Sequence, residues 1–324
     1  MTTEPLRWGL IGTGLIATEF ARDMTVTHSG RVAAIGSRSQ ESADRFAVQF
    51  DVPHAHASYE ALVADPEVDV VYVATPHPMH HANALLALEA NKPVLVEKAF
   101  TMNATEAREL VAAARSKELF LMEAMWTRFL PHTAEIKRLI AEGALGEIVS
   151  ITADHGQWFV KDPAFRLFAP DLGGGALLDL GVYPVSFASM ILGAPARIVS
   201  LITPAFTGVD GQTSMLFGYP SGAQAILTCT SSAKTPTRSA IVGTEARIEI
   251  EGDFYGPSSF TLVGRDGNTT RFEPAHEGGG LHYEADEVAR CLREGLSESP
   301  LMPLEETVSI METMDAIVAQ AQTT

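Results

Sequence analysis

The sequence predicts an α/β protein of two domains, in which a doubly wound parallel sheet precedes an α+β domain with a large, predominantly antiparallel open sheet. Three observations predict this arrangement. The chain has 324 residues, of which 46% are hydrophobic, and this is enough to fill two cores. Short apolar runs alternate with helix-like segments in its first part, and closely spaced β-like runs dominate the rest. We place the domain boundary after residue 124, so that the domains span 1–124 and 125–324.

The first domain is predicted from its alternation of strands and helices. Its apolar runs are short and nearly continuous, as is typical of parallel strands that are buried on both faces. The segments between them carry apolar residues at helical spacing. Because consecutive parallel strands need crossover connections, each helix is expected to link two strands. The predicted strands are 6–11, 31–36, 68–74, 93–96 and 119–122, and the predicted helices are 16–24, 42–50, 79–88 and 104–116.

The second domain is predicted to consist mainly of strands arranged as a meander. Turn residues separate the β-like runs, and few helical segments interrupt them. An open sheet of this kind exposes apolar surface unless a second subunit covers it, so we expect a homodimer through this sheet. The predicted helices are 133–142, 283–294 and 305–320, and the predicted strands are 148–155, 197–203, 213–217, 223–230, 238–242, 247–250 and 260–263.

Composition and charge exclude several classes of partner. The chain has 23 Lys and Arg residues against 40 Asp and Glu residues, and its net charge of −17 repels nucleic acid and anionic membranes. The N-terminus shows no basic segment before an apolar one, which predicts a cytoplasmic location. Cys229 and Cys291 lack the spacing of a disulfide framework, a thiolate metal site or a redox dithiol. The expected partner is a small-molecule substrate.

A glycine-rich turn follows the first predicted strand and precedes the first predicted helix. Gly12 permits a tight turn, Gly14 lets the backbone approach a pyrophosphate, and Ala17 allows close helix packing. The free amides at the start of the helix favour phosphate groups. The turn therefore predicts a dinucleotide-binding Rossmann domain, with the cofactor held by Gly12, Thr13, Gly14, Leu15 and Ile16.

The end of the second predicted strand bears on the choice of dinucleotide. NAD-specific domains commonly place an acidic residue there to bind the ribose 2′-hydroxyl, whereas residues 36–39 of this chain read Gly-Ser-Arg-Ser. Ser37 can form hydrogen bonds, and Arg38 can pair with a 2′-phosphate. These residues favour NADP, with NAD less favoured. The alternative interpretation of Arg38 is a solvated arginine at a helix start.

Two further loops are expected at the same edge of the sheet, because the carboxyl ends of parallel strands meet there. Hydride transfer from an alcohol needs a proton acceptor and electrostatic help for the developing alkoxide. Lys98 and His80 are candidates for these tasks, although His80 can also be a helix-start histidine without chemistry. The residues assigned to cofactor binding in these loops are Thr75, Pro76, His77, Glu97 and Lys98.

No metal-binding residues are expected in this chain. His77, His80 and His81 form a cluster in the sequence, but no carboxylate or thiolate accompanies them at metal-ligand spacing.

A second pair of candidates follows the glycines at 173–175. Helical geometry places Asp179 and Tyr183 on one face, four residues apart. A tyrosine phenol, with an ordinary pKa of about 10, becomes a usable proton donor or acceptor beside a cation such as Lys98. The alternative is a kinked helix without a shared face, because Pro184 disfavours helical geometry at the residue before it.

Together these segments resemble the Gfo/Idh/MocA family of oxidoreductases over essentially the whole chain. The resemblance rests on 12–14, 75–77, 97–98 and 174–183, which occur in the family's order and spacing. It implies an NAD(P)-dependent dehydrogenase with Lys98, Asp179 and Tyr183 as catalytic residues.

A narrower resemblance connects segments 122–129, 175–183 and 283–285 with the dimeric dihydrodiol dehydrogenase and NADP-dependent xylose dehydrogenase branch. This branch implies NADP, with His80 and Lys98 assisting a proton-transferring Tyr183. It also implies that Asp179 orients the substrate and that Trp126 and Arg128 belong to the substrate pocket. Packing at a hinge is the alternative interpretation of Trp126.

One departure from the family concerns Ala99, where proline is usual, so the Lys98 loop is expected to be less rigid. Several questions stay open at this stage. The substrate can be a sugar, a cyclitol, a ketone or a trans-dihydrodiol, and the reaction can run in either direction. The family also contains nucleotide-binding sensors without turnover, which is the alternative function.

Overall fold

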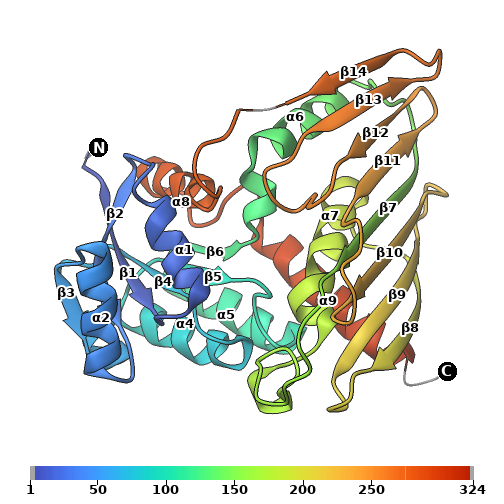
Figure 1. Cartoon of the computed structure of the whole chain (residues 1–324). Coiled ribbons are helices and arrows are strands. Elements are labelled where there is room, and N and C mark those ends of the chain that lie inside the picture. Colours follow the sequence, from blue (N-terminus) through green and yellow to red (C-terminus); the bar gives the residue numbers. More distant parts are fainter. Residues whose placement is uncertain (1–3, 274, 322–324) are drawn as a thin grey trace. The chain divides into compact units, whose positions relative to one another are not determined.

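The computed structural model describes residues 4–273 and 275–321, which form two compact units (Figure 1). Unit 1 comprises Met1–Phe129 and Glu277–Val308, and unit 2 comprises Leu130–His276 and Ser309–Thr324. The chain therefore returns to unit 1 late in the sequence.

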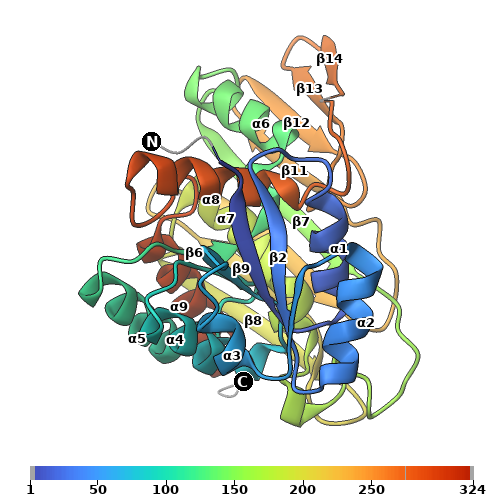
Figure 2. The same cartoon turned by 90° about the vertical axis from the view of Figure 1, so that its left-hand side faces the viewer.

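Unit 1 contains a six-stranded parallel sheet, sheet A, with the order β3-β2-β1-β4-β5-β6. This is the doubly wound arrangement that the sequence predicts, and helices flank both sides of the sheet (Figure 2). The short edge strand β3 and the short helix α3 were not predicted, because three and five residues carry too little periodicity. The strands are β1 Leu6–Ile11, β2 Gly30–Gly36, β3 His54–His56, β4 Val70–Val73, β5 Val94–Glu97 and β6 Leu121–Ala124.

Three helices of unit 1, α2, α3 and α5, begin at short polar side chains that cap them. Ser39, Ser58 and Asn103 each accept a hydrogen bond from a backbone N–H of the first helical turn. These caps explain why the helix after Asn103 starts at the predicted residue. The helices are α1 Leu15–Asp23, α2 Gln40–Phe50, α3 Tyr59–Val63, α4 His80–Glu89 and α5 Ala104–Ser116, with short 3₁₀ turns at His77–Met79 and Trp126–Phe129.

The segment Glu277–Val308 packs on unit 1, although the sequence prediction placed it in the second domain. Its helix α8, His282–Glu294, contacts β2 and the Trp126–Phe129 turn. Asp23 of α1 accepts hydrogen bonds from the backbone N–H groups of Gly279 and Leu281, both at 2.7 Å. The two hydrogen bonds of Asp23 join residues 256 and 258 positions apart, so local sequence patterns do not reveal them.

Unit 2 contains an eight-stranded sheet, sheet B, with the order β14-β13-β12-β11-β7-β10-β9-β8. All neighbours are antiparallel except β7 and β10, which confirms the predominantly antiparallel prediction. The order is not one meander, because β7 separates two meanders. The strands are β7 Ile148–Gly156, β8 Arg197–Pro204, β9 Asp210–Gly218, β10 Gln224–Thr230, β11 Ser239–Gly243, β12 Ala246–Ile250, β13 Phe260–Gly264 and β14 Thr269–Phe272.

Helix α7, Val182–Leu192, packs against β7 and β10 of sheet B, and a π-helical turn at Leu177–Gly181 leads into it. The whole segment Pro170–Leu192 is long and apolar enough to cross a membrane by length and composition. However, 72% of its apolar window is buried within the structure, as in the core helix of a globular domain. Unit 2 also contains α6, Pro131–Ala141, and the C-terminal part of α9, Leu304–Ala321.

Candidate active site

The glycine-rich turn of unit 1 has the geometry that a pyrophosphate requires. Gly12 has a φ of +107°, and a Cβ there would lie 2.9 Å from the carbonyl oxygen of Ala74. A Cβ at Gly14 would meet no atom within 4 Å, so this glycine is not needed for packing. Gly14 also caps α1, whose first residue, Leu15, is 74% exposed. Exposed helix-terminal amides beside an open backbone fit a dinucleotide phosphate.

The Ser37–Arg38 loop follows β2 at the same edge of sheet A. The Ser37 N–H donates to the carbonyl oxygen of His56 at 3.1 Å, and this bond ties the loop to β3. Arg38 is exposed, and its guanidinium lies beside the Tyr59 phenol. Burial raises the pKa of Tyr59, while the cation of Arg38 acts in the opposite direction. Arg38 is therefore accessible to an anion, although nothing in the fold requires an arginine there.

His80 has a structural environment that differs from the expected catalytic one. The ring is completely buried, and its Nε2 and Nδ1 face the carbonyl oxygens of Thr75 and Ala99 at 2.7 and 2.9 Å. Burial lowers the pKa of this imidazole. Through these two contacts, His80 connects the loop after β4 with the loop after β5. Its part in proton transfer stays a prediction.

The contacts of Glu97 also indicate that it positions a loop, although the sequence prediction assigned this residue to cofactor binding. Its carboxylate accepts a hydrogen bond from the Tyr72 hydroxyl and another from the backbone N–H of Lys98, the latter at 3.1 Å. Glu97 is 5% exposed, whereas Lys98 is partly accessible at the carboxyl end of β5. His77 faces the carbonyl oxygen of Lys98 at 3.3 Å. The peptide bond between Lys98 and Ala99 is cis, and the Ala99 side chain is fully buried.

Arg128 does not have the exposure expected of a substrate ligand. It is 4% exposed, and its guanidinium forms an ion pair with Glu306 at 2.8 Å. The neighbouring Glu123 is completely buried, and this burial raises its pKa to about 7 although Arg128 acts in the opposite direction. Glu284 of α8 is equally buried, and burial together with Glu97 holds its pKa well above the usual range. We therefore assign Arg128 to this buried charged network. Trp126, by contrast, remains partly accessible.

In unit 2, Asp179 and Tyr183 lie on consecutive helical turns, as their spacing predicts. Pro184 lacks the backbone N–H that would bond to the Leu180 carbonyl oxygen, but this oxygen accepts from His155 Nδ1 at 3.2 Å instead, so the helical segment continues. The preceding π-helical turn supplies the backbone adjustment. Asp179 is 5% exposed and Tyr183 is 7% exposed, so both side chains are held by packing.

Arg166 contacts Asp179 in a bidentate ion pair, at 2.9 and 3.1 Å. This planar, two-bond geometry fixes the orientation of the carboxylate. Arg166 belongs to the irregular segment before the Gly173–Gly175 turn and was missed in the sequence, because an arginine 13 residues from an aspartate gives no local signal. Asp210 is another missed residue: its carboxylate accepts from the Leu177 N–H at 2.5 Å and anchors the start of the helical segment.

The Tyr183 ring lies in an aromatic cluster with His155 and Tyr255. Its centroid is 5.2 Å from that of His155 and 4.7 Å from that of Tyr255, and the latter two rings stack at 4.3 Å. The Gln157 amide donates to His155 Nε2 at 3.0 Å, which makes Nδ1 the protonated nitrogen that donates to the Leu180 carbonyl. The neutral His155 ring is thus fixed beside Tyr183.

These features define a class of protein: a two-domain α/β protein with a dinucleotide-binding domain and a second domain that presents an acid and a phenol. Comparison of the chain with known protein families gives its family. A model of the oxidoreductase family with an NAD-binding Rossmann fold, GFO_IDH_MocA, matches residues 6–125, and a model of the GFO/IDH/MocA C-terminal domain matches residues 133–249. The chain belongs to the Gfo/Idh/MocA family of oxidoreductases, and the expected nicotinamide cofactor is confirmed at this level.

Curated relatives match the chain over nearly its full length. The trans-1,2-dihydrobenzene-1,2-diol dehydrogenase of Xenopus tropicalis is 37% identical over 97% of both chains, and that of Homo sapiens is 36% identical over 96% of both. Among solved structures, the 3-ketoreductase KijD10 of Actinomadura kijaniata in complex with NADP and TDP-benzene is 28% identical, with a TM-score of 0.87 over 98% of both chains. The chain is thus an oxidoreductase that is homologous to dihydrodiol dehydrogenases and to a ketoreductase.

Proposed function

We propose that this protein moves a hydride between C4 of the NADP nicotinamide and the carbon of a secondary hydroxyl or carbonyl group, with Tyr183 as the proton donor or acceptor. The observation that carries the proposal is the pair of Tyr183 and Asp179 on one helical segment, with Asp179 fixed by Arg166. The bound nicotinamide supplies the hydride chemistry, and the protein supplies binding, orientation and proton transfer.

NADP is the proposed dinucleotide because of the groups present at the adenosine end. The open backbone at Gly14 and the start of α1 would hold the pyrophosphate, and Ser37 and Arg38 would hold the 2′-phosphate. No carboxylate stands in the Ser37–Arg38 loop to bind an unphosphorylated ribose. The relative KijD10, whose structure contains NADP, supports this preference.

Tyr183 is the proposed proton-transfer group because its phenol is held by packing. In oxidation, the substrate hydroxyl gives its proton to the Tyr183 phenolate as the hydride leaves its carbon; in reduction, the phenol returns the proton to the developing alkoxide. Lys98 is the cation proposed to stabilise the phenolate. His80 supports this role indirectly, because it fastens the loop that carries Lys98.

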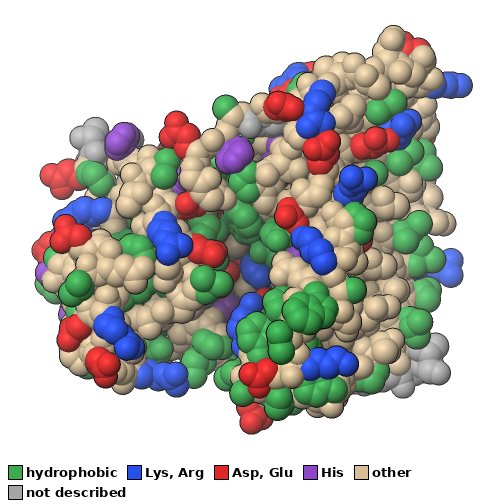
Figure 3. All heavy atoms as spheres, in the orientation of Figure 1, with side chains coloured by type: hydrophobic (Ala, Val, Ile, Leu, Met, Phe, Trp, Pro, Cys, Tyr) green, Lys and Arg blue, Asp and Glu red, His purple; other side chains and the backbone are tan. Residues whose placement is uncertain are grey.

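The substrate class that we propose first is a vicinal diol, or the corresponding hydroxyketone, on an apolar ring. The segment that contains Arg166 also presents exposed apolar side chains, at Trp158, Val160 and Phe165, which are 65%, 66% and 37% exposed. Figure 3 shows hydrophobic side chains gathered in the lower part of this face of the molecule. Through Arg166 this segment lies beside Asp179, whose carboxylate can accept hydrogen bonds from hydroxyl groups. The name of the trans-1,2-dihydrobenzene-1,2-diol dehydrogenases points to the same class. Aldoses and cyclitols are the alternatives.

The first experiment separates cofactor binding from turnover. NADPH binding is measured by fluorescence, and turnover is measured with trans-dihydrodiols, hydroxyketones, aldoses and cyclitols. Tyr183→Phe is expected to reduce kcat by about 10²- to 10⁴-fold with little change in NADPH affinity, because it removes the proton-transfer group alone. Lys98→Met is expected to act in the same direction.

The matched control is Tyr219→Phe, which removes another buried phenol of unit 2. Full turnover by Tyr183→Phe would contradict the proposed proton transfer. A wild-type protein that binds NADPH tightly but turns over none of these substrates would instead be a nucleotide-binding sensor.

We propose a homodimer through the outer face of sheet B. Register places Val199 of β8, Leu216 of β9 and Ile226 of β10 in one cross-strand row, and they are 53%, 42% and 51% exposed. Leu201 adds a 67% exposed neighbour. An apolar row of this kind favours burial against a second copy. Ile226→Arg is expected to shift the mass measured by light scattering from dimer to monomer, and an unchanged mass would contradict this interface.

The cytoplasm is the proposed compartment. Cys229 and Cys291 are both free and buried, which supports a reducing environment, and NADP-dependent turnover fits the cytoplasmic cofactor pool.

A further inference from the structure

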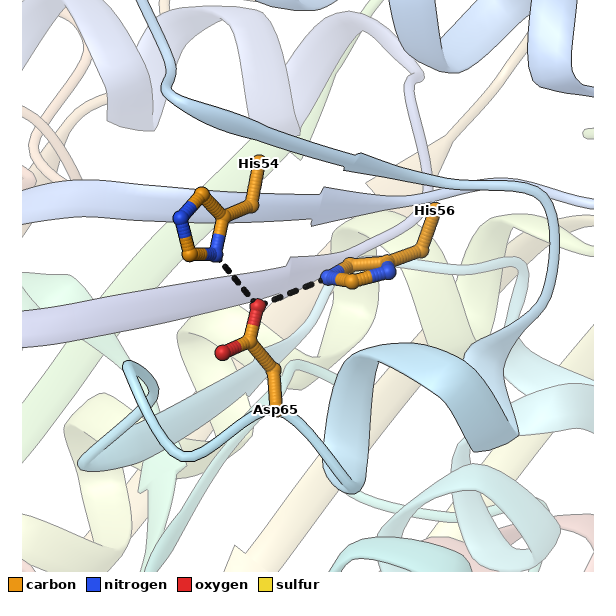
Figure 4. A group of neighbouring side chains, drawn as sticks. All are labelled: His54, His56 and Asp65. Carbon is orange, nitrogen blue, oxygen red and sulfur yellow. Dashed lines mark hydrogen bonds and ion pairs between the residues drawn. The ribbon is translucent and has the colours of Figure 1, made fainter.

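A group of three potential metal ligands lies in unit 1 at the edge strand β3, and three strands separate β3 from β5, which precedes Lys98. His54 and His56 occupy alternate positions of the edge strand β3, so their side chains leave the same face of the strand. Asp65 follows α3 and points toward both imidazoles (Figure 4). Its Oδ2 lies 2.6 Å from His54 Nδ1 and 2.8 Å from His56 Nε2. Two histidines thus converge on one carboxylate oxygen.

The carboxylate is held in place from behind. Oδ1 of Asp65 accepts a hydrogen bond from the Glu67 N–H at 2.8 Å, and the Asp65 side chain is only 4% exposed. The Lys92 ammonium donates to the carbonyl oxygens of Asp65 and Val68 at 3.0 and 2.6 Å, which fixes the turn that carries Asp65. A ligating carboxylate that is oriented by outer hydrogen bonds is a common feature of protein metal sites.

Each imidazole can present the nitrogen that faces Asp65 either as a donor or as a ligand. In the present arrangement, the facing nitrogens of His54 and His56 donate hydrogen bonds to Oδ2 of the Asp65 carboxylate. When the remaining nitrogen of each ring takes the proton instead, both facing nitrogens become ligands without net loss of charge.

We propose that His54, His56 and Asp65 bind one divalent transition-metal ion of the zinc type. Two imidazoles and one carboxylate form a ligand set of intermediate softness, and a fourth position remains for water because the histidine side chains are 38% and 23% exposed. Zinc bonds of about 2.0–2.2 Å place neighbouring tetrahedral ligands about 3.4 Å apart. The two N···O distances therefore lengthen by about 0.6–0.8 Å on binding, which side-chain rotation of the partly exposed imidazoles can supply.

Such an ion would fasten the edge strand β3 to the turn after α3. The His56 carbonyl oxygen accepts from the Ser37 N–H at 3.1 Å, so one proposed ligand residue is hydrogen-bonded directly to the Ser37–Arg38 loop. This inference does not depend on the proposed hydride transfer, because neither the ligands nor the test involve turnover.

The test uses the untagged, full-length protein after treatment with a chelator. Calorimetric titration with Zn²⁺ is expected to give one saturable site per chain. His54→Ala and His56→Ala are each expected to weaken Zn²⁺ binding by at least about tenfold, because each removes a ligand. Co²⁺ offers a second readout, since a bound ion with four ligands gives visible absorption that the two variants should lack.

His28→Ala is the matched control, because it removes an exposed histidine of the same unit, and it is expected to bind Zn²⁺ like the wild type. Wild-type protein without saturable Zn²⁺ binding would overturn the proposal, and so would equal affinities in His56→Ala and His28→Ala. In either case, the three side chains would be a hydrogen-bonded clamp on β3.

Discussion

Two glycine-rich segments, one in each unit, are similar in composition, but their glycines are needed for opposite structural reasons. Gly14 of unit 1 borders open space, since a Cβ there would meet no atom within 4 Å. In unit 2, a Cβ at Gly174 would lie 2.8 Å from the Leu167 carbonyl oxygen, and one at Gly175 would collide with the Asp210 carboxylate. The first glycine leaves room for a ligand, whereas the second pair lets the chain pack closely and sets the start of the helix that carries Asp179 and Tyr183.

The largest expected effect comes from Gly175→Ala. Gly175 has a φ of +135°, which L side chains rarely adopt, and its Cβ would displace the carboxylate that anchors Leu177. We expect a loss of about 2–4 kcal/mol in the free energy of unfolding, measured by urea denaturation.

Gly295→Ala serves as its control. Gly295 has a left-handed φ of +72° and ψ of +26°, but a Cβ there would meet no atom within 4 Å. Backbone strain alone should cost about 1 kcal/mol. Similar losses for the two variants would show that the Asp210 contact contributes nothing.

Gly14→Ala tests the other side of the comparison. The free energy of unfolding should stay within about 0.5 kcal/mol of the wild type, because the added methyl group meets no protein atom. NADPH affinity should fall by about 10- to 100-fold, because the methyl group occupies space that the pyrophosphate needs. Fluorescence titration and denaturation on the same preparation separate the two effects. Unchanged NADPH affinity would mean that the open space at Gly14 is not the pyrophosphate site.

The smallest expected effect comes from Arg38→Ala. The exposed guanidinium has no structural task apart from its contact with Tyr59, so stability should change little. NADPH affinity should fall by about tenfold, the loss of one charge-assisted contact, while NADH affinity should stay nearly constant. Parallel titrations with both dinucleotides measure the difference. Equal weakening of both would remove the argument for a 2′-phosphate contact at Arg38.

The candidate site was only partly predictable, and the surroundings of His80 and Arg128 show why. Both residues were assigned from their positions in motifs, which identify residue types but not the direction of a side chain. The structure directs the His80 nitrogens to backbone carbonyls and buries the Arg128 guanidinium against Glu306. Asp179 and Tyr183 were found because a spacing of four residues is a local property of a helix. Arg166, His155 and Tyr255 were missed because they reach that helix from other segments.

The sequence by itself determined the two-domain α/β class, the parallel first sheet, most strands and helices, and the positions of the glycine turn and the Asp179–Tyr183 pair. Periodicity, caps and turn residues are patterns that extend over only a few positions, so they can be recognised directly in the sequence. Only the tertiary structure decided that Glu277–Val308 packs on unit 1, that β7 separates two meanders, and that His54, His56 and Asp65 meet. These features depend on contacts between distant segments. The hydrophobic packing that produces such contacts leaves no local pattern in the sequence.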